Sequence, residues 1–131
     1  MTQQKCYRQG ELLFIKVEVP ETFKSSVMEA GKVKQNNVIR EGEVTGHIHK
    51  ASENAELLEF TDQRVSRWSN GRSFWKDGTS FKLPDGQMFL SADNKIVISH
   101  DEHNALSLPK GDYVIRIQRE YDEEQDRLIA D

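Results

Sequence analysis

Residues 87–121 have the sequence QMFLSADNKIVISHDEHNALSLPKGDYVIRIQREY, and this stretch decides the fold. Short runs rich in β-branched and aromatic residues alternate here with turn residues, a pattern typical of short neighbouring strands. The turn signals are Asp93-Asn94 and the segment Pro109-Lys110-Gly111. The stretch therefore predicts three strands, QMFLSA (87–92), KIVISH (95–100) and DYVIRIQREY (112–121).

The rest of the chain extends this pattern towards the N-terminus. Residues 11–19, ELLFIKVEV, end in alternating apolar and charged residues and are stopped by Pro20, which predicts a further strand. Residues 37–63 look like strands broken by Gly42 and Gly46, whereas residues 21–36 fit either a short helix or an irregular segment. The prediction is one mainly β domain over residues 1–131, a small β-barrel or sandwich, with an acidic tail at 122–131.

One segment differs in composition from its surroundings. Residues 64–86 are rich in Gly and Ser and hold three turn signals, so we expect an inserted hairpin or long loop. Its aromatic residues either pack the insertion onto the body or form a recognition surface; they are Trp68, Phe74, Trp75 and Phe81.

Bulk composition excludes several classes of protein. A net charge of −4 does not favour a nucleic-acid partner, which usually requires a basic face. The single cysteine, Cys6, cannot form an internal disulfide, which fits a reducing compartment. No apolar run is long enough to span a membrane, and the N-terminus lacks the apolar core of a secretory signal. We therefore expect a cytoplasmic protein.

The four histidines of the chain fall into two close pairs, His47 with His49 and His100 with His103. Residues two apart on a strand point to the same face, so His47 and His49 can bind one ion together. A turn after the strand that ends at His100 can bring His103 to the same side. Imidazole suits zinc, iron, nickel and copper, so the pairs predict one shared site for a divalent transition metal, with zinc the first choice.

Carboxylates adjoin both pairs and are the candidates for a catalytic base or for a partner that orients an imidazole. The candidates for the base are Glu53, Glu102 and Glu43, and Asp101 is a further neighbour of the second pair.

Four motifs resemble those of a family of small uncharacterised proteins from bacteria and their phages. They are Gln9-Gly10-Glu11, GEVTGHIH (42–49), HDEH (100–103), and LPKGDY (108–113) continuing to QREYD (118–122). The resemblance covers both ends and the middle of the chain and leaves out the insertion. It implies a common histidine site and an association with phages, but it carries no assigned activity.

The chain is also similar to cupins, in which two histidines and a glutamate on one strand and a later histidine surround a metal in a β-barrel. His47, His49 and Glu53 match the first part, and His100 or His103 supplies the last. The glycine expected after Glu53 is missing, and the last histidine precedes the Pro-Gly turn instead of following it. The resemblance therefore implies a cupin-like fold at most.

Three functions remain open. The first is a metal-binding domain in which four histidines fill the coordination shell and serve a structural or interaction role. The second is a cupin-like metalloenzyme, a hydrolase or oxygenase with three protein ligands and a carboxylate base. The third is a module that binds a protein or a small molecule through its Trp-rich insertion. Coordination number separates the first two, because closed four-ligand zinc sites are typically structural.

Overall fold

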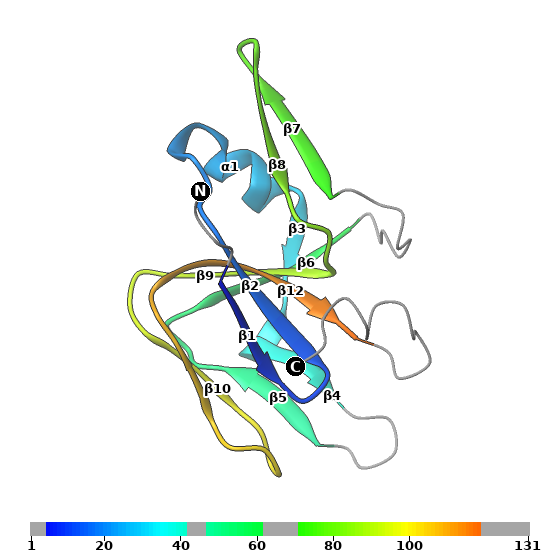
Figure 1. Cartoon of the computed structure of the whole chain (residues 1–131), viewed down its shortest axis with the longest axis vertical. Coiled ribbons are helices and arrows are strands. Elements are labelled where there is room, and N and C mark those ends of the chain that lie inside the picture. The colour runs from blue at the N-terminus through cyan, green and yellow to red at the C-terminus, as the bar shows by residue number, and fades with distance from the viewer. Residues whose placement is uncertain (1–4, 42–46, 62–70, 119–131) are drawn as a thin grey trace.

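The structure, a computed structural model, describes residues 5–41, 47–61 and 71–118, and it confirms the predicted mainly β fold (Figure 1). The helical elements are α1 (Glu21–Glu29) and the short 3-10 turn η1 (Gln35–Asn37). The strands are β1 (Cys6–Gln9), β2 (Leu12–Val17), β3 (Gly31–Val33), β4 (Val38–Glu41), β5 (Ile48–Ala51), β6 (Glu56–Phe60), β7 (Arg72–Lys76), β8 (Thr79–Leu83), β9 (Met88–Ala92), β10 (Ile96–Ser99), β11 (Leu106–Leu108) and β12 (Gly111–Ile117).

The largest sheet has six antiparallel strands in the order β1-β2-β12-β9-β6-β3. β12 lies inside it, with Val114 paired to Ile15 on β2 and to Phe89 on β9. Successive residues of a strand point to opposite faces, and Tyr113, Val114 and Ile115 are all fully buried. Both faces of this sheet are therefore covered.

A second sheet covers one of these faces, which makes the fold a sandwich and not a closed barrel among the described residues. Its four strands run in the order β11-β10-β5-β4. The apolar core between the two sheets is contributed by both of them; its largest members include Phe14, Leu57, Leu90, Tyr113, Ile39, Ile96 and Leu108.

The other face of the six-stranded sheet is covered by α1 and by the hairpin of β7 and β8 (Figure 1). Val27 of α1 and Leu83 of β8 are fully buried in this second core beside Phe89 and Val114 of the sheet. The segment that was ambiguous in the sequence, 21–36, is therefore a helix followed by β3 and a 3-10 turn.

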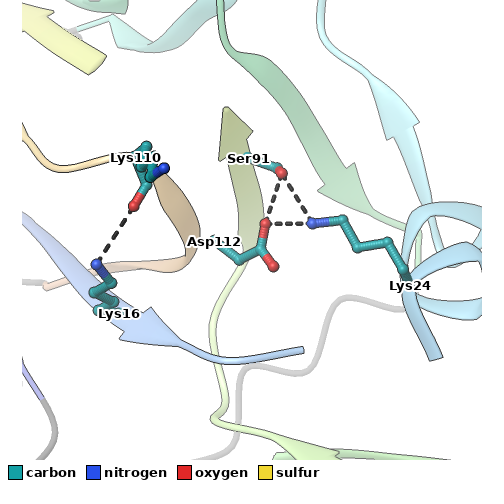
Figure 2. Close-up of polar contacts among 5 residues, drawn as sticks. All are labelled: Lys16, Lys24, Ser91, Lys110 and Asp112. Carbon is teal, nitrogen blue, oxygen red and sulfur yellow. Dashed lines mark hydrogen bonds and ion pairs between the residues drawn. The ribbon is translucent and has the colours of Figure 1, made fainter. Parts of the chain in front are cut away.

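A polar cluster ties α1 to the sheet, and Figure 2 shows it; we call it the lysine–aspartate cluster (Lys24, Ser91 and Asp112). The Lys24 ammonium contacts the Asp112 carboxylate and lies 3.0 Å from the Ser91 hydroxyl. That hydroxyl in turn donates to Asp112 Oδ1 at 2.6 Å. Each polar group thus finds a partner within the cluster.

The expected hairpin is present where residues 64–86 are described. β7 and β8 pair around the turn Asp77-Gly78, and both turn residues have positive φ, as a tight two-residue hairpin requires. Phe74 and Phe81 pack against the second core, which favours the packing role predicted for the aromatics. Trp75 instead faces solvent with 76% of its surface exposed. Trp68 lies outside the described residues.

Across the described part of the chain, no helix combines the length and the apolar character that a membrane crossing requires.

Candidate metal centre

The structure brings the four histidines to one end of the sandwich. His47 precedes β5, His49 lies on it, and His100 and His103 follow β10. β5 and β10 are antiparallel partners with Lys50 opposite Ser99, so His49 and His100 come out beside one another. We call this group the histidine cluster.

His100 is the ring that neighbours the other three. Its centroid lies 4.1 Å from that of His49, 4.5 Å from that of His103 and 5.7 Å from that of His47. His49 and His103 are nearly parallel, with their centroids 6.1 Å apart. Two pairs that are distant in sequence thus form one compact group.

Gln9, the last residue of β1, fixes the tautomer of His49. The buried Gln9 side chain donates through Nε2 to the carbonyl oxygens of Ile98, at 2.9 Å, and of Asn104, at 3.0 Å. Its Oε1 therefore faces His49 Nδ1, 2.8 Å away, as an acceptor. His49 carries its proton on Nδ1, which leaves the lone pair of Nε2 free.

His49 is also held in its neutral form. The pKa of His49 is lowered from 6.5 to about 4, mainly by burial and additionally by the positive charges that His100, His103 and Arg40 can carry. A buried imidazolium would lose its hydration and meet these like charges. At neutral pH, His49 thus offers an unprotonated nitrogen.

His100 is held in the opposite tautomer. Its Nδ1 accepts the backbone N–H groups of Glu102, at 3.0 Å, and of His103, at 3.1 Å. Because a backbone N–H can only donate, Nδ1 must be unprotonated and the neutral ring carries its proton on Nε2. Adjacent rings in the cluster therefore present different groups, a lone pair on His49 Nε2 and an N–H on His100 Nε2.

The β1–β2 turn closes over the cluster at Gly10. Gly10 has a φ of +58°, and a Cβ placed there would lie 2.9 Å from His103 Nε2 and 3.3 Å from His49 Cε1. Glycine is the residue that adopts such a φ at least cost and leaves room for the two rings. The turn continues into Glu11, whose carboxylate lies 2.7 Å from Arg40 Nε on the neighbouring sheet.

The predicted carboxylates divide between the cluster and other places. Glu102 adjoins the cluster, with its Oε1 3.5 Å from His47 Nδ1, although most of its side chain is exposed. Glu53 is exposed in the turn after β5, and its neighbour Asn54 bonds to the Lys95 carbonyl, at the end of β5 and β10 away from His100. Glu43 lies outside the described residues.

The donor atoms are close but do not yet surround one ion position. Among residues 5–41, 47–61 and 71–118, no group of three or more His, Cys, Asp or Glu side chains is arranged to hold a metal ion. His103 is exposed, so its ring has room to turn, and the side chain of His47 is partly exposed. His49, by contrast, is fixed by its bond to Gln9.

Two residues of the site had no predicted role, namely Gln9 and Gly10. Both stand in the motif Gln9-Gly10-Glu11, so the sequence marked their position without indicating what they contact. A glutamine at the end of a strand usually faces solvent, and only the tertiary fold brings this one beneath an imidazole.

Fold and cluster together define a small β-sandwich domain with four histidines at one end of its two sheets. The chain belongs to a family whose model is described as a domain of unknown function (DUF8820), and the match covers residues 8–118. This agrees with the resemblance to an uncharacterised family. No curated protein matches the chain, and no solved structure does.

Proposed function

We propose that this domain binds one divalent transition metal at the histidine cluster, with zinc the first choice and iron, nickel or copper the alternatives. The observation that carries the proposal is the state of His49, whose Nε2 lone pair is free while Nδ1 donates to Gln9. Histidines that bind metal usually donate their second ring nitrogen to an oxygen acceptor in this way.

The electrostatics of the cluster also support the proposal. Metal binding requires unprotonated imidazoles, and the lowered pKa of His49 means that no proton has to be displaced from it near neutral pH. A bound cation would also interact favourably with the nitrogen lone pairs of neighbouring unprotonated imidazoles. Turning an exposed imidazole to a new rotamer costs on the order of 1 kcal/mol, little beside the roughly 10 kcal/mol or more that structural zinc supplies.

Two roles follow from such a site. With four histidine ligands the metal would link β5 to the β10–β11 loop and serve a structural or interaction role. With fewer ligands it would support chemistry, and Glu102, beside His47, is then the carboxylate in place to act as a base. A bacterial or phage origin, a cytoplasmic location and an unidentified protein or small-molecule partner remain predictions from the sequence. So does the recognition role of the insertion, for which Trp75 is the exposed aromatic.

The experiment is metal analysis of full-length protein purified without a histidine tag, followed by titration with Zn²⁺, Fe²⁺, Ni²⁺ and Cu²⁺. We expect about one equivalent for the wild type and a loss of affinity of at least about 100-fold for His49→Ala, because even partners of ligands contribute 10- to 100-fold. Glu53→Ala is the matched control, since Glu53 lies away from the cluster and should not affect binding. Failure of all four metals to bind the wild type would refute the proposal.

A further inference from the structure

We infer that the outer edge of β8 binds an extended acidic peptide as a third strand of the β7–β8 hairpin, and that Trp75 and Lys82 contact the side chains of this peptide. The inference does not rest on the proposed metal site. The hairpin and the second sheet, which carries the histidine cluster, cover opposite faces of the six-stranded sheet.

The hairpin has the longest regular edge strands in the described part of the chain. β7 and β8 have five residues each and pair without a register shift. The outer strands of the two larger sheets have three or four residues, and the pairing of β4 with β5 is irregular. Short and irregular edges discourage pairing with other chains, whereas a longer regular edge is a template for it. Figure 1 shows the hairpin projecting away from both larger sheets.

Hairpin geometry determines which backbone groups of β8 point outward. The residues that flank a two-residue turn, here Lys76 and Thr79, form a hydrogen-bonded pair, and such pairs alternate with non-hydrogen-bonded ones. Ser80 and Lys82 therefore direct their N–H and C=O groups away from β7. Within the described residues, these groups bond to no other element. The backbone of α1 lies closer to β7 than to β8, so the β8 edge is the more accessible of the two.

The outer face of the hairpin carries side chains that suit recognition. Phe74 and Phe81 pack against the second core, so the alternate residues of both strands face away from it. These residues are all exposed and comprise Ser73, Trp75, Ser80 and Lys82. Tryptophan is one of the residues that most often dominate the binding energy of an interface. Trp75 stands opposite Ser80, whose small side chain leaves the indole within reach of a strand added beside β8.

Charge determines the kind of peptide. The exposed charged side chains of β7 and β8 are Lys76 and Lys82, and neither strand contains an acidic residue. A second copy of this chain, paired antiparallel along β8, would bring two Lys82 side chains into one short sheet, where like charges repel. A segment with a carboxylate opposite Lys82 and an apolar side chain opposite Ser80 complements both the lysine and Trp75. In strand addition, main-chain hydrogen bonds supply affinity and such side-chain contacts supply specificity.

The first test needs only the free protein. In hydrogen-exchange NMR, the amide hydrogens of Ser80 and Lys82 should exchange rapidly, whereas that of Phe81, which bonds to β7, should exchange more slowly. Slow exchange of Ser80 and Lys82 in dilute protein would show that this edge is already occupied and would overturn the inference. Protection that appears only as the protein concentration rises would show pairing between copies and would overturn it as well.

The second test titrates the full-length protein with a labelled peptide of sequence GSEVFTS, whose Glu and Phe are designed to lie opposite Lys82 and Ser80. We expect saturable binding with a Kd below about 1 mM and slower exchange of the Ser80 and Lys82 amides in the complex. N-methylation at the peptide Phe, whose N–H bonds to Ser80, should abolish binding. N-methylation at the peptide Val, whose N–H points away from β8, should not. Absence of saturable binding, or equal loss with both methylated peptides, contradicts the inference.

Variants of the hairpin test the side chains. Trp75→Ala should weaken peptide binding about tenfold. Lys82→Glu should weaken it about 2- to 5-fold and favour the peptide GSKVFTS instead. Ser80→Pro removes an outward N–H without taking a bond from the hairpin and should abolish binding, and Ser80→Ala is its matched control. If Trp75→Ala and Lys82→Glu bind GSEVFTS as the wild type does, the inference is wrong.

Thermal unfolding shows first whether each variant folds as the wild type does. Should Ser80→Pro not fold, the two methylated peptides make the same comparison from the side of the peptide. All these variants keep the histidine cluster intact and should bind metal as the wild type does. Loss of peptide binding with metal binding retained would therefore concern the hairpin alone, and absence of metal binding in the wild type would leave the peptide tests unaffected.

Discussion

Two polar clusters join distant parts of this chain, and they differ in how completely their members satisfy one another. In the lysine–aspartate cluster, the Lys24 ammonium, the Ser91 hydroxyl and the Asp112 carboxylate bond to each other and hold α1 on the sheet (Figure 2). In the histidine cluster, Gln9 engages one nitrogen of His49 and leaves the other free. A cluster whose polar groups are all hydrogen-bonded to one another stabilises a fold. A cluster that keeps an oriented nitrogen lone pair has a group available to bind a ligand.

The largest expected effect comes from removing the residue that orients this lone pair. Gln9→Ala leaves the His49 Nδ1–H and the carbonyls of Ile98 and Asn104 without their buried partner, which should lower the free energy of unfolding by about 3 kcal/mol. Urea unfolding measures this, with Gln9→Met as a control that keeps the volume of the side chain. Equal stability of Gln9→Met and the wild type would show that the hydrogen bonds contribute nothing.

Acid should destabilise the metal-free protein through the same histidine. The folded-state pKa of His49 is about 4, below its ordinary value of 6.5. Between these two pH values the unfolded chain binds a proton on His49 that the folded chain does not bind. The stability that depends on neutral His49 is complete above pH 6.5 and is lost as the pH falls to about 4, by at most about 3 kcal/mol.

Thermal unfolding across this pH range, with chelator present, measures the slope. The variant His49→Gln lacks the titrating group and should show a shallower decline. If its decline matched that of the wild type, the acid sensitivity would arise outside the histidine cluster.

A smaller effect is expected from adding a methyl group at the β1–β2 turn. Gly10→Ala places a side chain at a positive φ, which costs about 1–2 kcal/mol, and brings it 2.9 Å from His103 Nε2. Gly78→Ala is a matched control, because Gly78 also has a positive φ but has nothing within 4 Å of an added Cβ. Both variants should lose similar stability, while only Gly10→Ala should shift the NMR signals of His103. A shift of equal size in both would contradict this close approach.

The smallest effect should come from a substitution in the lysine–aspartate cluster. Asp112→Asn removes the charge opposite Lys24 but keeps an oxygen that can accept from Ser91, so we expect a loss of about 1 kcal/mol in unfolding free energy. Metal affinity should be unchanged, because the cluster lies on the α1 side of the sheet. A change in metal affinity comparable to that of His49→Ala would break the distinction between the two clusters.

Strands were the most predictable part of the fold, and the reason is local. Short apolar runs bounded by turn residues or proline identified β2, β9, β10 and β12, and the stretch 37–63 was expected to hold broken strands, since each strand carries its own pattern. The order of the strands was not predictable, because it depends on which apolar faces meet. The helix α1 was ambiguous for a similar reason: its packing depends on a sheet assembled from residues far along the chain.

Spacing predicted that His47 and His49 share a strand face and that a turn brings His103 beside His100. In the structure His49 lies on β5 whereas His47 precedes it, and His100 is the ring next to His47. Spacing could not distinguish their tautomers, which depend on Gln9 and on two backbone N–H groups. It also suggested Glu53 as a neighbour, but β5 ends before that residue and its turn leads away from His100.

The pairing of β2 with β12 has a consequence for how the protein is made. Val17 pairs with Asp112, so β2 and β12, which are neighbours inside the six-stranded sheet, come from opposite ends of the described chain. Contacts that close so long a loop slow folding, because the entropy of closure is lost before the contacts form. On the ribosome, β1 and β2 therefore emerge long before their partner is synthesised. During that interval the apolar side chains of Leu12 and Phe14 lack the strand against which they are buried, and exposed apolar surface of this kind favours aggregation of nascent chains.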